Sequence, residues 1–411
     1  MSKEKRRVPK LRFPGFTEDW EQRKLIYIFN DFIVPMRDKP KVFSGTTPWT
    51  RIEDIEGRYI NTSLSGQFVS DETIKSMNLK VIPKGSLIVS ASATFGVVAI
   101  VNNDLITNQT FIGLVPNKDF DIDFLYSLFE APTTKGKLLK LSAGSTIFYI
   151  ARESFENLVL SVPSKEEQIK ISKVFKSIDD SITLHQRKLN NLKLKKKALL
   201  QKLFPKNGER YPELRFPGFT DAWEQRKLSD ISTKVTTKNI DVHYTETLTN
   251  SAEQGIISQV DFFDKEISNK DNINGYYIVE NNDFIYNPRI STLAPVGPIN
   301  RNKLNRTGIM SPLYTVFRAS NVDLDFLEWY FQSSHWHRYM KLNGDSGARA
   351  DRIAIKDSTF FDMPIKTPVN IKEQVLIGET LEKFNQYITL HQRKLDHLQL
   401  QKKALLQQMF I

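Results

Sequence analysis

The chain contains no cysteine in 411 residues. This absence excludes disulfide bonds, thiolate metal ligands and cysteine nucleophiles. The sequence also lacks any run of about 18 apolar residues, and its basic start, MSKEKRRVPK, is not followed by the apolar core of a signal peptide. We therefore expect a soluble, cytoplasmic protein that makes no contact with a membrane.

Catalytic motifs are absent as well. The sequence has no G-x-x-x-x-G-K-[ST] phosphate loop, no G-x-G-x-x-G after a predicted strand and no H-E-x-x-H metal motif. The segment YNPRI, Tyr286–Ile290, lacks the second proline and the aromatic residue of an amino-methyltransferase site, and we interpret it as the turn after a strand. We expect no catalytic residue, no metal site and no cofactor in this chain. Activity of the purified chain alone would instead indicate a self-contained nuclease or methyltransferase.

The charge balance is basic. The formal net charge is +11 and the isoelectric point is near 9.4, with 40% hydrophobic and 26% charged residues. This composition is typical of a globular chain, and the basic excess favours a polyanionic partner such as nucleic acid. A lysine-rich solvated surface gives the same charge, so the organisation of the chain must distinguish the two interpretations.

The sequence consists of two tandem copies of one unit of about 200 residues. Three segments recur in the same order: LRFPGF…WEQRKL at Leu11–Leu25 and Leu214–Leu228, ITLHQRKL at Ile182–Leu189 and Ile388–Leu395, and KKALLQ at Lys196–Gln201 and Lys402–Gln407. The middle of each copy has diverged. The ends of the unit are therefore expected to share a structural role that the middle does not.

Each copy is expected to end in a long helix. The first begins with Ser164 and Glu167 in the capping-box pattern and meets no glycine or proline before Pro205. The second begins with Asn370 as its cap. It contains Gly378, which costs about 1 kcal/mol relative to alanine but does not end the helix.

Apolar residues recur along both predicted helices in steps of three, four and seven, which is the pattern of a coiled coil. The expected coiled-coil seam is Ile171, Phe175, Ile178, Ile182, Leu189, Leu192, Leu199, Leu203, Ile377, Leu381, Phe384, Ile388, Leu395, Leu398 and Leu405. Each helix offers the other a partner stripe, and the connectivity makes the pair antiparallel, with a pseudo-two-fold axis. His185 and His391 occupy equivalent positions, where we expect polar groups that set the register.

The middle regions, about 26–162 and 229–367, are predicted to be mixed α/β. Aromatic residues on the predicted helices Ile122–Glu130 and Leu324–Ser334 are interpreted as core rather than as base-stacking surfaces. Polar and arginine side chains in turn-rich segments are the candidates for contacts with DNA: Thr46, Thr47, Arg51, Ser90, Ser92, Thr94, Ser145, Thr146, Tyr149, Arg152, Arg289, Ser291, Thr292, Arg349 and Arg352. Solvated loops are polar too, so each candidate has a plain structural alternative.

These features resemble the specificity (S) subunit of type I restriction-modification systems over essentially the whole chain. The resemblance rests on LRFPGF at both unit starts, IPKGSLIVS…FGVVAIV, VPSKEEQIKI before the first long helix, and ITLHQRKLxxLxLxKKALLQ at the close of each unit. The ordered duplication is its most specific part. It implies a mixed α/β (α+β) fold in which two globular target-recognition domains are separated by two long antiparallel coiled-coil helices.

The resemblance implies the following segments along the chain: an N-terminal repeat segment (1–25), a first target-recognition domain (26–162), a central long helix (163–204), a linker with the second repeat segment (205–228), a second target-recognition domain (229–367) and a C-terminal long helix (368–411). Each domain would read one half of a bipartite, asymmetric site on double-stranded DNA. The coiled coil would fix the spacing and dock the modification subunits.

The resemblance also implies partners and cofactors outside this chain. They are two modification subunits that use S-adenosylmethionine to methylate adenine, and two restriction subunits that use ATP and Mg. The chain itself would be a non-catalytic subunit of a multi-subunit DNA methyltransferase and ATP-dependent endonuclease. The alternative is a coiled-coil assembly scaffold with protein-binding end domains, whose binding would be insensitive to salt and indifferent to DNA.

Overall fold

The computed structural model describes residues 6–35, 38–90, 96–141, 152–206, 208–263, 270–345 and 351–411. It divides into a first unit, Met1–Lys188 with His391–Ile411, and a second unit, Leu189–Leu390. The two long helices, α6 (Lys165–Lys202) and α12 (Ile371–Met409), each have one part in either unit. The predicted fold class is confirmed, since the chain is mixed α/β with two globular parts and a helical coiled coil. The segment boundaries implied above stay a prediction.

The first unit carries two β-sheets and a short strand pair in its described residues. Its elements before α6 are β1 (Glu21–Lys24), α1 (Leu25–Ile28), β2 (Phe29–Ile33), β3 (Thr47–Thr50), η1 (Ile52–Asp54), β4 (Ile55–Glu56), β5 (Tyr59–Ile60), β6 (Phe68–Val69), α2 (Asp71–Ser76), β7 (Leu87–Ser90), β8 (Val98–Val101), β9 (Ile106–Thr107), β10 (Phe111–Pro116), α3 (Ile122–Glu130), α4 (Pro132–Leu141), α5 (Arg152–Glu156) and β11 (Val159–Val162). The sheets have the orders β2-β10-β7-β8-β5-β4 and β6-β3-β9, and β1 pairs with β11.

The second unit repeats this plan with smaller sheets. Its elements before α12 are β12 (Glu224–Lys227), α7 (Leu228–Ile231), β13 (Ser232–Lys234), β14 (Leu248–Ser251), β15 (Gly255–Ser258), α8 (Gln259–Phe263), η2 (Lys270–Gly275), β16 (Tyr277–Val279), β17 (Phe284–Tyr286), β18 (Ile299–Arg301), β19 (Gly308–Met310), β20 (Thr315–Ala319), α9 (Leu324–Gln332), α10 (His337–Asn343), α11 (Asp357–Phe361) and β21 (Pro364–Thr367). The order β13-β20-β17-β18 matches β2-β10-β7-β8 of the first unit, and β12 pairs with β21 as β1 does with β11. The repeat therefore extends into the divergent middle regions.

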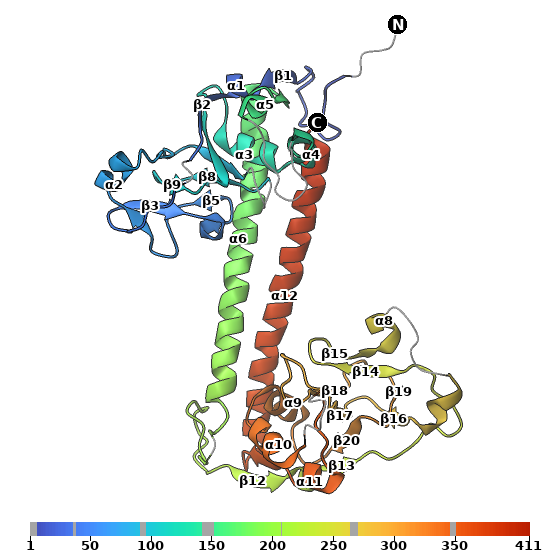
Figure 1. Ribbon diagram of the computed structural model, residues 1–411. Coiled ribbons are helices and arrows are strands. Elements are labelled where there is room, and N and C mark those ends of the chain that lie inside the picture. The colour runs from blue at the N-terminus through green and yellow to red at the C-terminus, as the bar shows by residue number, and fades with distance from the viewer. Residues whose placement is uncertain are drawn as a thin grey trace. The chain divides into compact units, whose positions relative to one another are not determined.

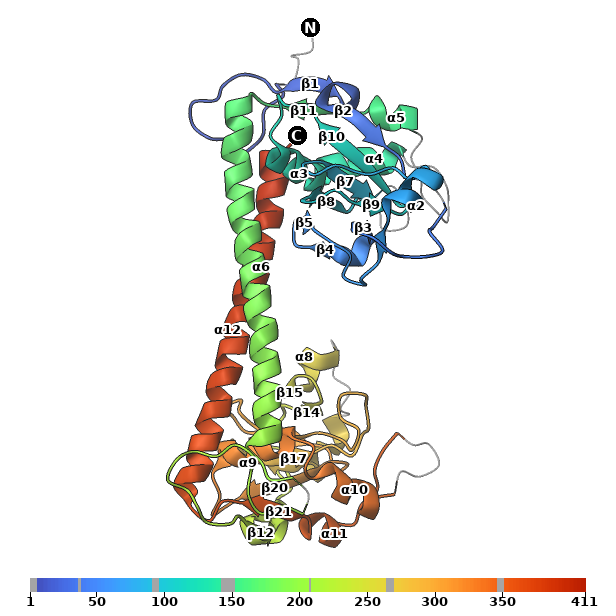
Figure 2. The same cartoon turned by 90° about the vertical axis from the view of Figure 1, so that its left-hand side faces the viewer.

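The helices α3 and α9 bring the aromatic residues of each unit into its core. Each begins with an aspartate, Asp121 or Asp323, whose side chain accepts the backbone N–H three residues on at 2.8 Å. Phe124 and Phe326 are fully buried. The interpretation of these aromatic faces as core is confirmed. In Figures 1 and 2, α3 lies beside the part of α6 that belongs to the first unit.

The starts of the long helices explain two features of the sequence. The hydroxyl of Ser164 accepts the Glu167 N–H at 3.4 Å, and the side chain of Asn370 accepts the Lys372 N–H at 2.9 Å. Gly378 is buried where α12 meets the start of α9, and a Cβ there would lie 2.9 Å from the Cβ of Asp325. Gly378 is therefore not simply a weak point of the helix, because it permits this close approach.

Candidate functional site

The repeated segment LRFPGF…WEQRKL joins both long helices within each unit. The Arg12 guanidinium binds the Glu167 carboxylate at the start of α6 through two hydrogen bonds of 2.8 Å, and the Leu11 N–H donates to the Gln408 carbonyl near the end of α12. Trp20, only 1% exposed, packs edge-on against Phe410. The segment therefore fixes the helix ends to the globular part of the first unit.

The second unit repeats these contacts with equivalent residues. Arg215 binds Glu373 at 2.8 and 2.9 Å, and the Leu214 N–H donates to the Lys202 carbonyl. Glu167 and Glu373 are each 1% exposed, so both carboxylates depend on their arginine for compensation. Glu167 was expected to fold back in a capping box, but its carboxylate is bound to Arg12 instead.

Two glutamines add to these contacts, which together we call the repeated framework. The side-chain oxygen of Gln168 accepts the Asp121 N–H at 3.0 Å, and that of Gln374 accepts the Asp323 N–H at 2.9 Å. Each glutamine thereby joins the start of a long helix to the start of α3 or α9. The sequence analysis assigned no role to these residues, although the dipeptide Glu-Gln recurs at the start of both long helices.

The helix pair is antiparallel within each unit. In the first unit, Asp179 of α6 forms an ion pair of 2.6 Å with Lys402 of α12. In the second unit, Lys196 of α6 donates to Asn385 of α12 at 2.9 Å. All predicted coiled-coil seam residues are buried or half-buried. Leu406, which the sequence reasoning left out, is buried as well.

His185 and His391 face each other across the helix pair. Their Nδ1 atoms lie 2.8 Å apart, and the ring centroids are 5.0 Å apart. Burial is the main cause that lowers the pKa of His185, and the charges of His391, Lys188 and Lys394 add to it. A hydrogen bond between the two Nδ1 atoms requires one of them as the acceptor, so at least one ring must be neutral.

The first unit also contains a buried ion cluster at the helix pair. Arg58 is 2% exposed, lies 3.0 Å from the Asp123 carboxylate and 3.5 Å from that of Asp179, and has its guanidinium 4.5 Å from the centre of the Tyr126 ring. An arginine that is buried to this degree needs such partners. Arg58 is therefore a structural residue rather than one available to DNA.

The described DNA-contact candidates of the first unit differ in their surroundings. Thr46 is exposed and Thr47 is half-buried. Arg51 donates to the Gln67 side chain at 2.8 Å, and the exposed Arg152 forms an ion pair of 2.6 Å with Glu156. Ser90 is 1% exposed at the end of β7, so its hydroxyl is not presented to solvent and it is the poorest candidate.

The described candidates of the second unit gather at one place. Arg289 and Arg352 are directly opposite each other in an antiparallel β-bridge, and both side chains are exposed. Ser291 and Thr292 follow Arg289 closely along the chain and are exposed too. The interpretation of YNPRI as the turn after a strand is confirmed, because β17 ends at Tyr286. Like charges placed opposite each other are unfavourable unless an anion lies between them.

Six candidates lie outside the described residues, namely Ser92, Thr94, Ser145, Thr146, Tyr149 and Arg349. Contact with DNA stays a prediction for all candidates. In the part of the chain that the structure describes, no group of three or more His, Cys, Asp or Glu side chains could hold a metal ion. Within the same residues, no helix is long and apolar enough to cross a bilayer.

Comparison with known proteins finds that the chain is similar to members of one family. The sequence model of the family described as "Type I restriction modification DNA specificity domain" matches residues 17–194. The "Type I restriction enzyme MjaIX specificity subunit" of Methanocaldococcus jannaschii is 30% identical over 196 residues, 44% of this chain and 42% of that protein. This match therefore spans less than half of the relative.

Two further matches extend over nearly the whole chain. The "Type I restriction enzyme MjaVIII specificity subunit" of the same organism is 22% identical over 424 residues, 96% of this chain and 92% of that protein. The crystal structure of the type I restriction-modification system S subunit from M. genitalium has the same fold, with a TM-score of 0.64 at 13% identity over 98% of this chain and 99% of that one. The family match covers the first copy of the unit, and the second copy repeats its ordered segments and their contacts. The family model therefore matches the first copy of the unit, and the whole chain is similar in sequence and in fold to type I restriction-modification specificity subunits.

Proposed function

We propose that this chain gives a type I restriction-modification complex its DNA sequence specificity, with each recognition domain reading one half of a bipartite, asymmetric site. The observation that carries the proposal is the contrast between a repeated framework and divergent candidate contact residues. Arg12 and Glu167 have counterparts in Arg215 and Glu373 with nearly identical geometry. The exposed candidate arginines, in contrast, differ in their surroundings: Arg152 begins α5 in the first middle region, whereas Arg289 and Arg352 form an isolated β-bridge in the second.

The exposed pair Arg289 and Arg352 suits a nucleic-acid contact in the second domain. Neither side chain forms an ion pair with another described residue, and the two residues are opposite each other in the β-bridge. Arginine forks bind phosphate oxygens and the O6 and N7 atoms of guanine. These residues are the first choice for base or phosphate contacts in the second half-site.

The catalytic parts of the complex belong to other chains in this proposal. Two modification subunits supply S-adenosylmethionine-dependent adenine methylation, and two restriction subunits supply ATP- and Mg-dependent translocation and cleavage. The coiled coil formed by α6 and α12 fixes the gap between the half-sites and docks the modification subunits. Recognition by two modules on one scaffold resembles dimeric DNA readers, whose half-site spacing mirrors the protein.

The proposal is tested by mapping adenine methylation in genomic DNA from cells that contain this chain and its modification subunit. The expected result is a single bipartite motif with two specified halves and a gap of fixed length. Cells without the chain should lose methylation at that motif while keeping the modification subunit. Methylation that persists without the chain, or that shows no bipartite motif, would contradict the proposal.

A further inference from the structure

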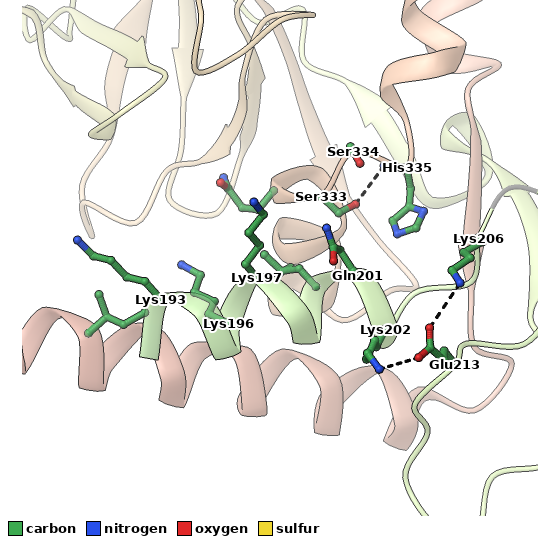
Figure 3. Close-up of a pocket in the computed structure, with 13 residues that line it drawn as sticks. Lys193, Lys196, Lys197, Gln201, Lys202, Lys206, Glu213, Ser333, Ser334 and His335 are labelled. Atoms are coloured by element: carbon green, nitrogen blue, oxygen red, sulfur yellow. Dashed lines mark hydrogen bonds and ion pairs between the residues drawn. The ribbon is translucent and has the colours of Figure 1, made fainter. Parts of the chain in front are cut away.

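A basic pocket lies in the second unit between α6 and the end of α9. Its volume is about 750 Å³, and its lining includes Lys193, Lys196, Lys197, Gln201 and Gln332. Figure 3 shows Lys193, Lys197 and Gln201 extending from α6 toward the side on which Ser333, Ser334 and His335 lie. We call this site the α6 lysine pocket.

The first unit has an equivalent lysine whose charge is compensated. Lys402 is the first residue of the second KKALLQ segment, as Lys196 is of the first. Lys402 forms ion pairs with Asp179 at 2.6 Å and with Glu130, the last residue of α3. Both carboxylates are buried or half-buried, so the positive charge of Lys402 is already compensated within the protein.

The second unit replaces both of these carboxylates by amides. Asn385 stands where the first copy has Asp179, three residues before ITLHQRKL, and Gln332 ends α9 as Glu130 ends α3. Lys196 donates to Asn385 at 2.9 Å and lies 4.5 Å from the centre of the Trp329 ring. Burial lowers the pKa of Lys196, against the effect of Glu382 and Glu328.

The acidic residues near the pocket are already paired with other cations. Glu328 binds Arg301 at 2.8 Å and Lys303 at 3.2 Å, and Glu382 lies 3.5 Å from Lys303. Glu213, the acidic residue in the lining, binds Lys202 at 2.6 Å and Lys206 at 3.5 Å, as the dashed lines of Figure 3 mark. The pocket therefore keeps an excess of positive charge.

Two more lysines add to this excess. Lys193 and Lys197 are exposed, and no ion pair of either with a described residue is present. They are four residues apart on α6, so their side chains lie on one face of the helix, about one turn apart. Lysine ammonium groups with amide and hydroxyl donors beside them are typical ligands of phosphate groups.

We propose that the α6 lysine pocket binds phosphodiester groups of the DNA that the second domain reads, with Lys193, Lys196 and Lys197 as the cationic contacts. This inference rests on the proposed function. The pocket gives affinity without sequence information, because phosphates are the same at every base pair. The equivalent site in the first unit does not share this role, because its lysine, Lys402, forms ion pairs with Glu130 and Asp179.

The test measures the affinity of the full chain for a duplex with its motif between about 50 and 200 mM salt. Lys193→Gln with Lys197→Gln removes two phosphate contacts, so the slope of log K against log salt is expected to become shallower by about 1.8. Over that range the salt-induced loss of affinity becomes about tenfold smaller. The variant should weaken binding equally to duplexes with the cognate and with a scrambled second half-site.

Lys383→Gln provides the matched control. Lys383 is an exposed lysine of the same unit that lies 3.7 Å from Glu379, and its removal should leave the slope unchanged. An unchanged slope in the double variant, or an equal change in the control, overturns the proposal while the proposed function stands. A wild-type chain that binds no duplex in a salt-dependent way overturns both.

Discussion

Single residues connect the elements of each unit through buried contacts that recur in both copies. Glu167 and Glu373 are each 1% exposed, and each is bound by one arginine from the repeated segment. A buried carboxylate that loses its only cationic partner destabilises a fold by roughly 3–5 kcal/mol. This dependence explains why the repeated segment contains an arginine at the same place in both copies.

Gly378 gives the sharpest stability prediction at this scale. Gly378→Ala should lower the free energy of unfolding by up to about 2 kcal/mol, because its Cβ would lie 2.9 Å from the Asp325 Cβ and the Phe326 backbone nitrogen. Overpacking of this kind costs about 1–3 kcal/mol, and the gain of about 1 kcal/mol in helix propensity offsets part of it. Gly136 in α4 is the matched control, since a Cβ there meets nothing within 4 Å. Gly136→Ala should stabilise by about 1 kcal/mol through helix propensity. Urea unfolding measures both, and a stabilising Gly378→Ala would contradict the packing at this site.

The long helices α6 and α12 were the elements most accessible from sequence. Their caps, their apolar periodicity and the absence of breakers all depend on residues close in the chain. The helix Ile122–Glu130 was also predicted with the bounds that α3 has. Local patterns of this kind predict each helix separately, and they do not indicate which helices and strands contact one another.

Contacts between distant residues could not be predicted in this way. Arg12 and Glu167 are 155 residues apart, and nothing near either residue indicates the other. The pairing of β10 with β2 and β7 is likewise non-local. Gly378 is an example. The sequence indicated its low helix propensity, but it did not indicate that α9 packs closely against it. For the candidate DNA contacts, polar loop composition alone did not separate the exposed Arg289 from the buried Ser90.

The histidine pair of the helices predicts a dependence of stability on pH. The pKa of His185 is lowered in the folded chain, so below about pH 6.5 the unfolded chain takes up more protons than the folded one. Stability should therefore fall as the pH falls from 8 toward about 5.5. Thermal unfolding should show a smaller fall for His185→Asn with His391→Asn. The exposed His397→Asn serves as control. An equal fall in wild type and double variant would contradict this role of the pair.

In the proposed function, the whole molecule combines a constant framework with two exchangeable recognition domains. The framework residues recur in both copies, and the candidate contact residues lie in the middle regions, which differ. The half-site sequences should then depend on the middle regions alone. The gap length should depend on the helices α6 and α12.

The most direct test replaces residues 26–162 with the corresponding region of a type I specificity subunit and maps adenine methylation in cells with the modification subunit. The proposed function predicts a new bipartite motif in which one half differs, while the other half and the gap length are unchanged. Unfolding measurements on the exchanged chain confirm that it is folded. A change in both halves, or a change in the gap length, would contradict the proposed function.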